Sequence, residues 1–161
     1  LQTDPGTGLF NRQYLMQQFE IAKKELSTNG SLYLIQLDCD DFELINQQFN
    51  HVIADNLLRD VGQYIKSSVG HNNIVARIEG DKFLVLLPNS VLDTVLQVAD
   101  MLREGIAQQL FNDIQITVSV GVTGGGKTSE YSSLHQDSEN AVKQAKSKGK
   151  NKVILGELLE L

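Results

Sequence analysis

Apolar residues recur along the chain with two spacings, and each spacing predicts one kind of element. Steps of three and four residues, as in Leu15, Phe19 and Ala22, place apolar side chains on one face of a helix. Continuous or alternating apolar runs predict strands, and the run at residues 31–38 is typical of a strand buried on both faces. These patterns predict helices at residues 11–27, 42–49, 54–69, 90–110 and 132–148, and strands at residues 31–38, 73–78, 83–88, 114–123 and 151–155.

The order of these elements predicts an α+β fold. The central part reads strand, helix, hairpin, helix, strand, which is the ferredoxin-like βαββαβ arrangement. We therefore expect a central, mostly antiparallel sheet with helices packed on one face. The sequence contains no repeats and no internal linker, so a single domain is expected.

Composition excludes several classes of protein. The chain has 161 residues, 20 of them acidic and 14 basic, and a formal net charge of −6. Nucleic acid is not an expected partner, because its binding would require a basic face. No apolar stretch approaches the roughly 20 residues of a membrane span, so direct membrane insertion is not expected. The single cysteine, Cys39, cannot form an internal disulfide, which favours a reducing compartment, the cytoplasm.

Candidate chemistry gathers where acidic residues end a strand. Asp38 and Asp40 are two residues apart, so their side chains can project from the same face at the end of the buried strand. Asp81 lies in the EGDK turn of the predicted hairpin and could lie beside them. Carboxylates placed in this way suit Mg²⁺. Spacing alone favours the simpler alternative, in which these acids solvate strand ends and cap helices.

Residues 121–128, GVTGGGKT, satisfy the P-loop formula G-x-x-x-x-G-K-[ST]. A P-loop requires a strand that ends at its first glycine, but Gly121 falls inside the predicted strand at residues 114–123. Only about thirty residues follow, which we take as too few for a parallel βαβ unit. We expect a flexible surface loop here, and a P-loop NTPase is a minor alternative.

Five segments, in the same order, resemble motifs of the GGDEF, or diguanylate cyclase, domain family. Residues 4–12 (DPGTGLFNR) resemble D-x-L-T-G-L-x-N-R, and residues 77–83 (RIEGDKF) resemble R-x-G-G-D-E-F. Residues 37–58, 118–122 and 138–153 resemble the family's D-x-D-x-F-K-x-I-N-D motif, its late S-x-G strand and its A-D-x-A-L-x-x-A-K-x-x-G-R-N motif. The resemblance spans nearly the whole chain and implies a nucleotidyl-cyclase, or palm-like, fold.

The resemblance also implies a reaction and a site. Active members join two GTP molecules into cyclic di-GMP, and each half-site holds one GTP and divalent metal at a dimer interface. By position, Asp38, the Cys39 carbonyl and Asp81 match metal-binding positions. The guanine-reading pair falls at Asn46 and Asp55, and the cations that meet the triphosphate fall at Lys146 and Lys150.

Several departures from the family pattern fall on this chemistry. The signature is occupied by Glu79, Gly80, Asp81, Lys82 and Phe83. Lys82 replaces a metal-binding Glu, Glu43 replaces a phosphate-facing Lys, and Glu79 replaces a Gly that lets nucleotide approach the backbone. Asn50 and Ala54 replace two further glycines, and Gln47 replaces an Asp. The inhibitory product site, R-x-x-D, would fall at residues 70–73, GHNN, where neither charged residue is present.

These departures predict a degenerate domain without catalytic residues and without a cofactor. Mg²⁺ and GTP are expected only where residual binding survives, and the vestigial metal site at Asp38, Cys39 and Asp81 is expected to be unoccupied. Lys82 is predicted to act as a built-in cation near Asp38 and Asp81. The alternatives are a GTP-binding sensor domain and an active cyclase with unusual ligands.

The resemblance further implies partners. GGDEF domains are commonly followed by an EAL domain, and dual-domain proteins of FimX-like type show both domains in degenerate form. We expect residues 1–155 to form the domain and residues 156–161 to begin a linker to an EAL-like neighbour. A homodimer is the other partner that the family implies.

Overall fold

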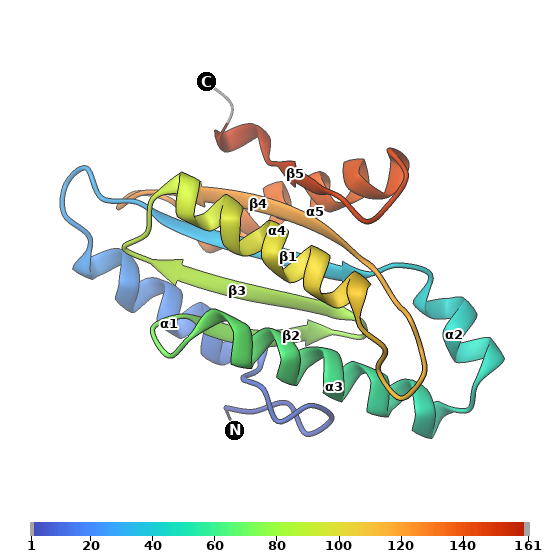
Figure 1. Cartoon of the computed structure of the whole chain (residues 1–161). Coiled ribbons are helices and arrows are strands. Elements are labelled where there is room, and N and C mark those ends of the chain that lie inside the picture. Colours follow the sequence, from blue (N-terminus) through green and yellow to red (C-terminus); the bar gives the residue numbers. More distant parts are fainter. Residues whose placement is uncertain (1, 160–161) are drawn as a thin grey trace.

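The computed structural model describes residues 2–159, and its centre is a five-stranded sheet (Figure 1). Strand β1 pairs antiparallel with β3 and β4, and β2 pairs antiparallel with β3. Among the five strands of the described residues, β5 alone runs parallel to its neighbour, β4. The sheet order is β2 (Ile74–Glu79), β3 (Lys82–Pro88), β1 (Leu32–Cys39), β4 (Val118–Gly125) and β5 (Val153–Leu155). The predicted α+β fold with a mostly antiparallel sheet is confirmed.

Helices cover both faces of this sheet (Figure 1). The helices are α1 (Arg12–Glu25), α2 (Phe42–Gln48), α3 (His51–Val69), α4 (Leu92–Gln108) and α5 (Tyr131–Ser147), followed by the short 3₁₀ helix η1 (Glu157–Leu159). Residues of α3 and α4 share one hydrophobic core with the sheet, and residues of α1 and α5 share a second core on the opposite face. No helix within residues 2–159 combines the length and the hydropathy needed to cross a membrane.

The expectation of helices on one face only is therefore wrong, and β1 gives the physical reason. Every residue of β1 is buried. Ile35 and Leu37 belong to the core under α3 and α4, while Leu32 and Leu34 belong to the core under α1 and α5. A strand that is apolar on both faces must be covered on both. By the same alternation, Asp38 lies on the α1 and α5 face.

Two element boundaries differ from the sequence prediction. Helix α3 begins at His51 rather than near residue 54, because the Asn50 side chain accepts a hydrogen bond from the Ile53 N–H at 2.9 Å and caps the helix. Strand β4 begins at Val118 rather than at residue 114. The reason is that Ile114 exchanges two backbone hydrogen bonds with Phe111, at 2.9 and 3.0 Å, in a local turn.

The first five residues of the P-loop-like segment, 121–125, are part of the sheet. Gly121, Gly124 and Gly125 all lie in β4, and a Cβ at Gly121 would come within 2.5 Å of the Ser138 carbonyl oxygen on α5. Gly121 therefore permits close packing of a helix and does not end a strand. The predicted loop is therefore wrong for residues 121–125; in the turn that follows, the Lys127 ammonium donates to the Leu26 carbonyl at 2.9 Å. The chain-length argument is also wrong, since β4, α5 and β5 do form a parallel unit.

The chain after β5 remains hydrogen-bonded to the domain. The backbone N–H groups of Glu157 and Leu158 donate to the buried Asp137 carboxylate at 3.0 and 3.2 Å, and Thr123 donates to it at 2.6 Å. Of the segment expected to begin a linker, residues 156–159 thus pack on the domain, and residues 160–161 lie outside the described residues. A linker to a further domain stays a prediction.

Candidate functional site

The signature segment forms a tight hairpin, as predicted. Glu79 and Lys82 face each other across a two-residue turn made by Gly80 and Asp81. Gly80 has φ +45°, a backbone conformation that a residue with a side chain rarely adopts. The Arg77 side chain braces the turn, because its Nε–H donates to the Gly80 carbonyl at 2.7 Å. The Gly80 backbone and the Arg77 hydrogen bond therefore both support this turn.

Lys82 lies directly opposite Asp38 in the pairing of β1 with β3. Its ammonium contacts Glu139 Oε1 on α5 at 3.3 Å and Glu79 Oε1 at 3.4 Å. Burial alone would lower the pKa of Lys82, but the charges of Asp38 and Glu139 outweigh burial and raise it. Lys82 is thus a stable cation inside the acidic cluster. Its direct contacts are with the two glutamates, and its charge also acts on Asp38 and Asp81, near which it was predicted to lie.

Asp38 is a buried carboxylate with a single hydrogen-bond donor among the described side chains, the amide of Gln36 at 3.0 Å. Burial raises the pKa of Asp38 to about 6, although the Gln36 hydrogen bond and the Lys82 charge oppose that rise. Gln36 also donates to Glu139 at 3.0 Å. One amide therefore joins the strand-end acid to the glutamate that holds Lys82.

Asp40 faces the same side as Asp38, but it has a structural role. It accepts hydrogen bonds from the Thr117 and Ser119 hydroxyls, both at 2.6 Å, and from the Asn151 N–H at 3.1 Å. These donors tie the end of β1 to β4 and to the loop before β5. Asp40 is therefore satisfied by the protein itself.

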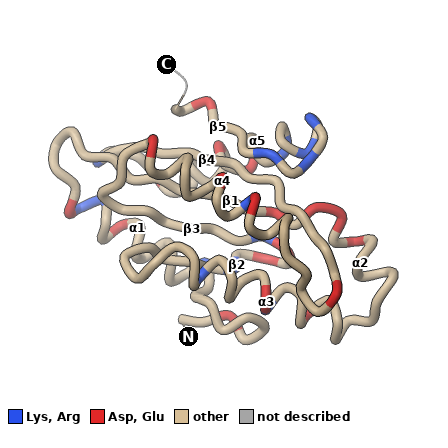
Figure 2. The backbone as a smooth tube through the Cα atoms, in the orientation of Figure 1, with Lys and Arg blue, Asp and Glu red and all other residues tan. Residues whose placement is uncertain are grey.

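The two lysines expected to meet a triphosphate reach the end of β1. Lys146 Nζ donates to the Cys39 carbonyl at 3.3 Å, and Lys150 Nζ contacts Asp41 Oδ1 at 2.6 Å. Figure 2 shows basic residues gathered around the end of α5 and acidic residues around the connection from β1 to α2. The structure thus brings Lys146 and Lys150 to the predicted place and pairs both with the protein.

Asp81 completes this corner. Burial raises the pKa of Asp81, its own backbone N–H and the charges of Lys146 and Lys82 lower it, and the charge of Glu43 raises it. The Asp81 carbonyl accepts a hydrogen bond from the Cys39 N–H at 3.1 Å, which fixes the hairpin against the end of β1. Asp38, Cys39, Asp81 and Lys82 are therefore neighbours, as the sequence predicted.

Comparison with known proteins identifies the family. The family described as "Diguanylate cyclase, GGDEF domain" matches residues 1–152. The chain belongs to the GGDEF domain family. It is 31% identical over 94% of its length to the response regulator PleD of Caulobacter vibrioides, of which it spans 35%. It is 29% identical over 92% of its length to the diguanylate cyclase DgcS of Shewanella oneidensis, of which it spans 50%. The curated relatives are thus much longer than this chain.

Solved GGDEF structures share the fold. The diguanylate cyclase SiaD of Pseudomonas aeruginosa, solved with its activator SiaC, superposes with a TM-score of 0.90 at 26% identity, over 96% of this chain and 61% of that one. The GGDEF domain of FimX from Pseudomonas aeruginosa superposes with a TM-score of 0.87 at 19% identity, over 95% of this chain and 98% of that one. At that identity, the likeness to FimX concerns the fold alone.

The donor set of this GGDEF domain fits a divalent metal poorly. Among the described residues, no three His, Cys, Asp or Glu side chains are grouped as metal ligands. Asp38 and Asp81 are the carboxylates at the site, the Cys39 carbonyl already accepts from Lys146, and the fourth position holds the Lys82 ammonium. An ammonium removes a ligand and repels the cation that the site would bind.

The expected guanine-reading pair lies on the helices of the β1–β2 connection. Asn46 is an exposed residue of α2, and Asp55 is an exposed residue of α3. Neither side chain has a hydrogen bond or ion pair within residues 2–159. Their assignment to guanine stays a prediction from the resemblance.

Two residues of the cluster were not anticipated from the sequence. Glu139 holds Lys82, and Gln36 joins Glu139 to Asp38. Gln36 had a detectable signal, because it is the one polar residue inside the apolar run at residues 32–37. A buried polar side chain requires partners, so its position pointed to a polar group on the covering helix.

Proposed function

We propose that this GGDEF domain does not cyclise GTP and serves as a regulatory or interaction module in cyclic di-GMP signalling. The observation that carries the proposal is the position of Lys82. It lies opposite Asp38 in the strand pairing, and Glu139 and Glu79 hold its ammonium within 3.4 Å. The lysine is therefore built into the fold at a position where the family has a metal ligand.

Two neighbouring groups support the same conclusion. Glu43, at a position where the family has a phosphate-facing lysine, adds negative charge next to Asp81. Lys146 occupies the Cys39 carbonyl with a hydrogen bond. Loss of one strong transition-state contact costs on the order of a hundredfold in rate, so the combined changes would abolish turnover. The names of DgcS and SiaD are those of cyclases, which makes a direct assay of this chain the decisive test.

The proposal includes partners and a location. An EAL-like domain in the same polypeptide would receive the regulatory effect, and a homodimer is the family's usual assembly. A cytoplasmic location accords with Cys39, which is buried and unpaired.

A second candidate is a GTP sensor that binds nucleotide without turnover. The observation that favours it is the exposure of Asn46 and Asp55, which leaves an amide and a carboxylate free for a ligand. In this version, bound GTP would change the contact with the neighbouring domain.

Calorimetry with GTP and Mg²⁺, run beside an assay for cyclic di-GMP, separates these functions. We expect no product, and no heat of binding if the domain acts through contacts alone. Heat without product supports the sensor. Formation of cyclic di-GMP would refute the proposed loss of catalysis.

A triple reversal tests the charge argument directly. The variant combines Lys82→Glu, Glu43→Lys and Glu79→Gly, and we expect it to gain binding of GTP with Mg²⁺. Because the net charge rises by one, Glu25→Gln on the exposed end of α1 is the matched control and should gain nothing. If the triple variant also binds no nucleotide, the block lies outside these three charges.

A further inference from the structure

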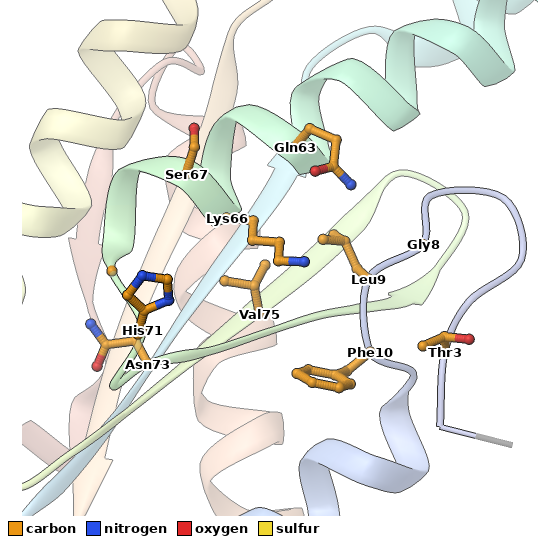
Figure 3. A pocket seen from close by; sticks show the side chains of 11 residues that line it. Thr3, Gly8, Leu9, Phe10, Gln63, Lys66, Ser67, His71, Asn73 and Val75 are labelled. Carbon is orange, nitrogen blue, oxygen red and sulfur yellow. The ribbon is translucent and has the colours of Figure 1, made fainter.

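A cavity lies on the β2 edge of the domain, away from the signature hairpin tip. Its volume is about 600 Å³, and its walls come from the N-terminal segment before α1, the last turns of α3 and the start of β2. Figure 3 shows these walls around one space. A volume of this size is typical of small-molecule sites.

The N-terminal wall of the cavity is fixed by hydrogen bonds. The Asp4 N–H donates to the Leu9 carbonyl at 2.7 Å, and the Gly8 N–H donates to the Asp4 carbonyl at 2.8 Å. The Asp4 carboxylate accepts from Thr7 and pairs with Arg77 of β2 at 3.2 Å. The segment that resembles the family's entry motif therefore forms a preformed wall.

The lining of the cavity combines an apolar floor with two basic side chains. Leu9, Phe10 and Val75 supply the apolar surface, and Lys66 and His71 lie above it. In Figure 3, the Lys66 side chain extends over Val75, with His71 on one side and Leu9 on the other. Among residues 2–159, no Asp or Glu lines the cavity, although the chain carries a net charge of −6.

Neither basic side chain is used by the protein. Within residues 2–159, Lys66 and His71 have no hydrogen bond or ion pair, whereas Gln63 and Asn73 each donate to a backbone carbonyl. A cation without a partner beside an apolar floor is suited to a ligand with one charged end and one apolar end.

We propose that this cavity binds a small organic anion, a carboxylate or phosphate carried on an aromatic ring. Lys66 and His71 face the anionic group, and the ring packs on Val75 between Leu9 and Phe10. This site is separate from the signature cluster. Its lining includes Gly70, His71 and Asn73, at the position of the family's product site. The Arg and Asp of that product site are absent here, so the basic groups of the cavity are Lys66 and His71.

The test is a titration of the isotope-labelled domain, in which binding is monitored by the amide chemical shifts. The probe is indole-3-carboxylate, and the neutral indole-3-carboxamide is its matched control. We expect saturable shifts at Gly8, Gly70 and Val75, with a dissociation constant of millimolar order. The carboxamide should bind several-fold more weakly, because it lacks the charge.

Variants test whether Lys66 supplies the positive charge that binds the carboxylate. Lys66→Met should weaken carboxylate binding by about tenfold, the usual effect of losing a charged hydrogen bond. Ser67→Glu, on the exposed rim, should weaken binding by repulsion. Lys24→Met on α1 removes an equal charge from an exposed residue outside the cavity lining and should change nothing.

Several results would overturn the proposal. Equal affinity for the carboxylate and the carboxamide would remove the role of the Lys66 charge. Equal affinity for inorganic phosphate alone would remove the role of the apolar floor. Tighter binding of cyclic di-GMP with the same amide shifts would show that the cavity binds that nucleotide and not a small aromatic anion. The absence of shifts at these three amides would show that the cavity does not bind the anion.

Discussion

The substitution Asp38→Asn measures how much the buried charge of Asp38 lowers the stability of the domain. Asp38 is 5% exposed, and burial raises its pKa from the ordinary 3.8 to about 6. Asparagine has the same shape and keeps an oxygen that can accept the Gln36 hydrogen bond. The variant therefore removes the buried charge with little change in packing.

The size of the effect follows from the pKa of Asp38. The difference between about 6 and 3.8 corresponds to about 3 kcal/mol of folding free energy. Because the folded pKa lies above the unfolded value, ionisation costs stability, and the cost is complete above about pH 6 and small near pH 4. The wild type is thus penalised at neutral pH, and the variant should be more stable there by about 2–3 kcal/mol.

Urea unfolding across the acid and neutral range measures this cost. In thermal unfolding at neutral pH we expect the melting temperature to rise by roughly 5–10 °C for a domain of this size. The difference in unfolding free energy between the variant and the wild type should narrow to about 1 kcal/mol near pH 4.5. Asp55→Asn is the control, since Asp55 is exposed and should change stability by less than about 0.5 kcal/mol.

A destabilised Asp38→Asn variant at neutral pH would refute this reasoning. It would mean that Lys82 compensates Asp38 completely and that the pair is a net contributor to stability. A gap that stays constant with pH would refute it as well, because the effect would then come from packing and not from ionisation.

Further substitutions test the cation, the helix cap and the close approach of α5. Lys82→Met should lower stability by about 1–2 kcal/mol in urea unfolding, because Glu139 then loses its cation; an unchanged stability would show that the ion pair is idle. Asn50→Ala should cost about 1 kcal/mol, and Asn50→Gly only a few tenths; equal losses would contradict the capping role. Gly121→Ala should lower the melting temperature, at a cost of about 1–3 kcal/mol, because its Cβ would meet the Ser138 carbonyl; a neutral result would show that α5 can move away.

Elements with clear periodicity could be predicted from the sequence, but the faces that they cover could not. The apolar run of β1 already implied cover on both sides, yet counting helices does not place them on a face. The start of α3 was missed because Val52 is exposed and the apolar pattern begins at Ala54, whereas the Asn50 cap starts the helix earlier.

The parts of the candidate site that belong to a single sequence motif could be predicted. The hairpin at Gly80 and the lysines at the end of α5 could be placed from motifs. The partners of Lys82 could not, because the contact with Glu139 joins residues 57 positions apart, and Gln36 reaches the same carboxylate across 103 positions. Side-chain choices between several nearby carboxylates depend on packing that a sequence pattern does not contain.

The polar residues of β1 have a consequence for how the sheet assembles. An eight-residue strand that is buried on both faces has little to distinguish one alignment with its neighbours from the next. A slip by one residue would turn Gln36 and Asp38 into the apolar core under α3 and α4, without Glu139 or Ser138 to meet them. Such a misalignment would cost several kcal/mol. Asp38 can therefore help to fix the pairing register of the central strand, and this role requires neither metal nor nucleotide.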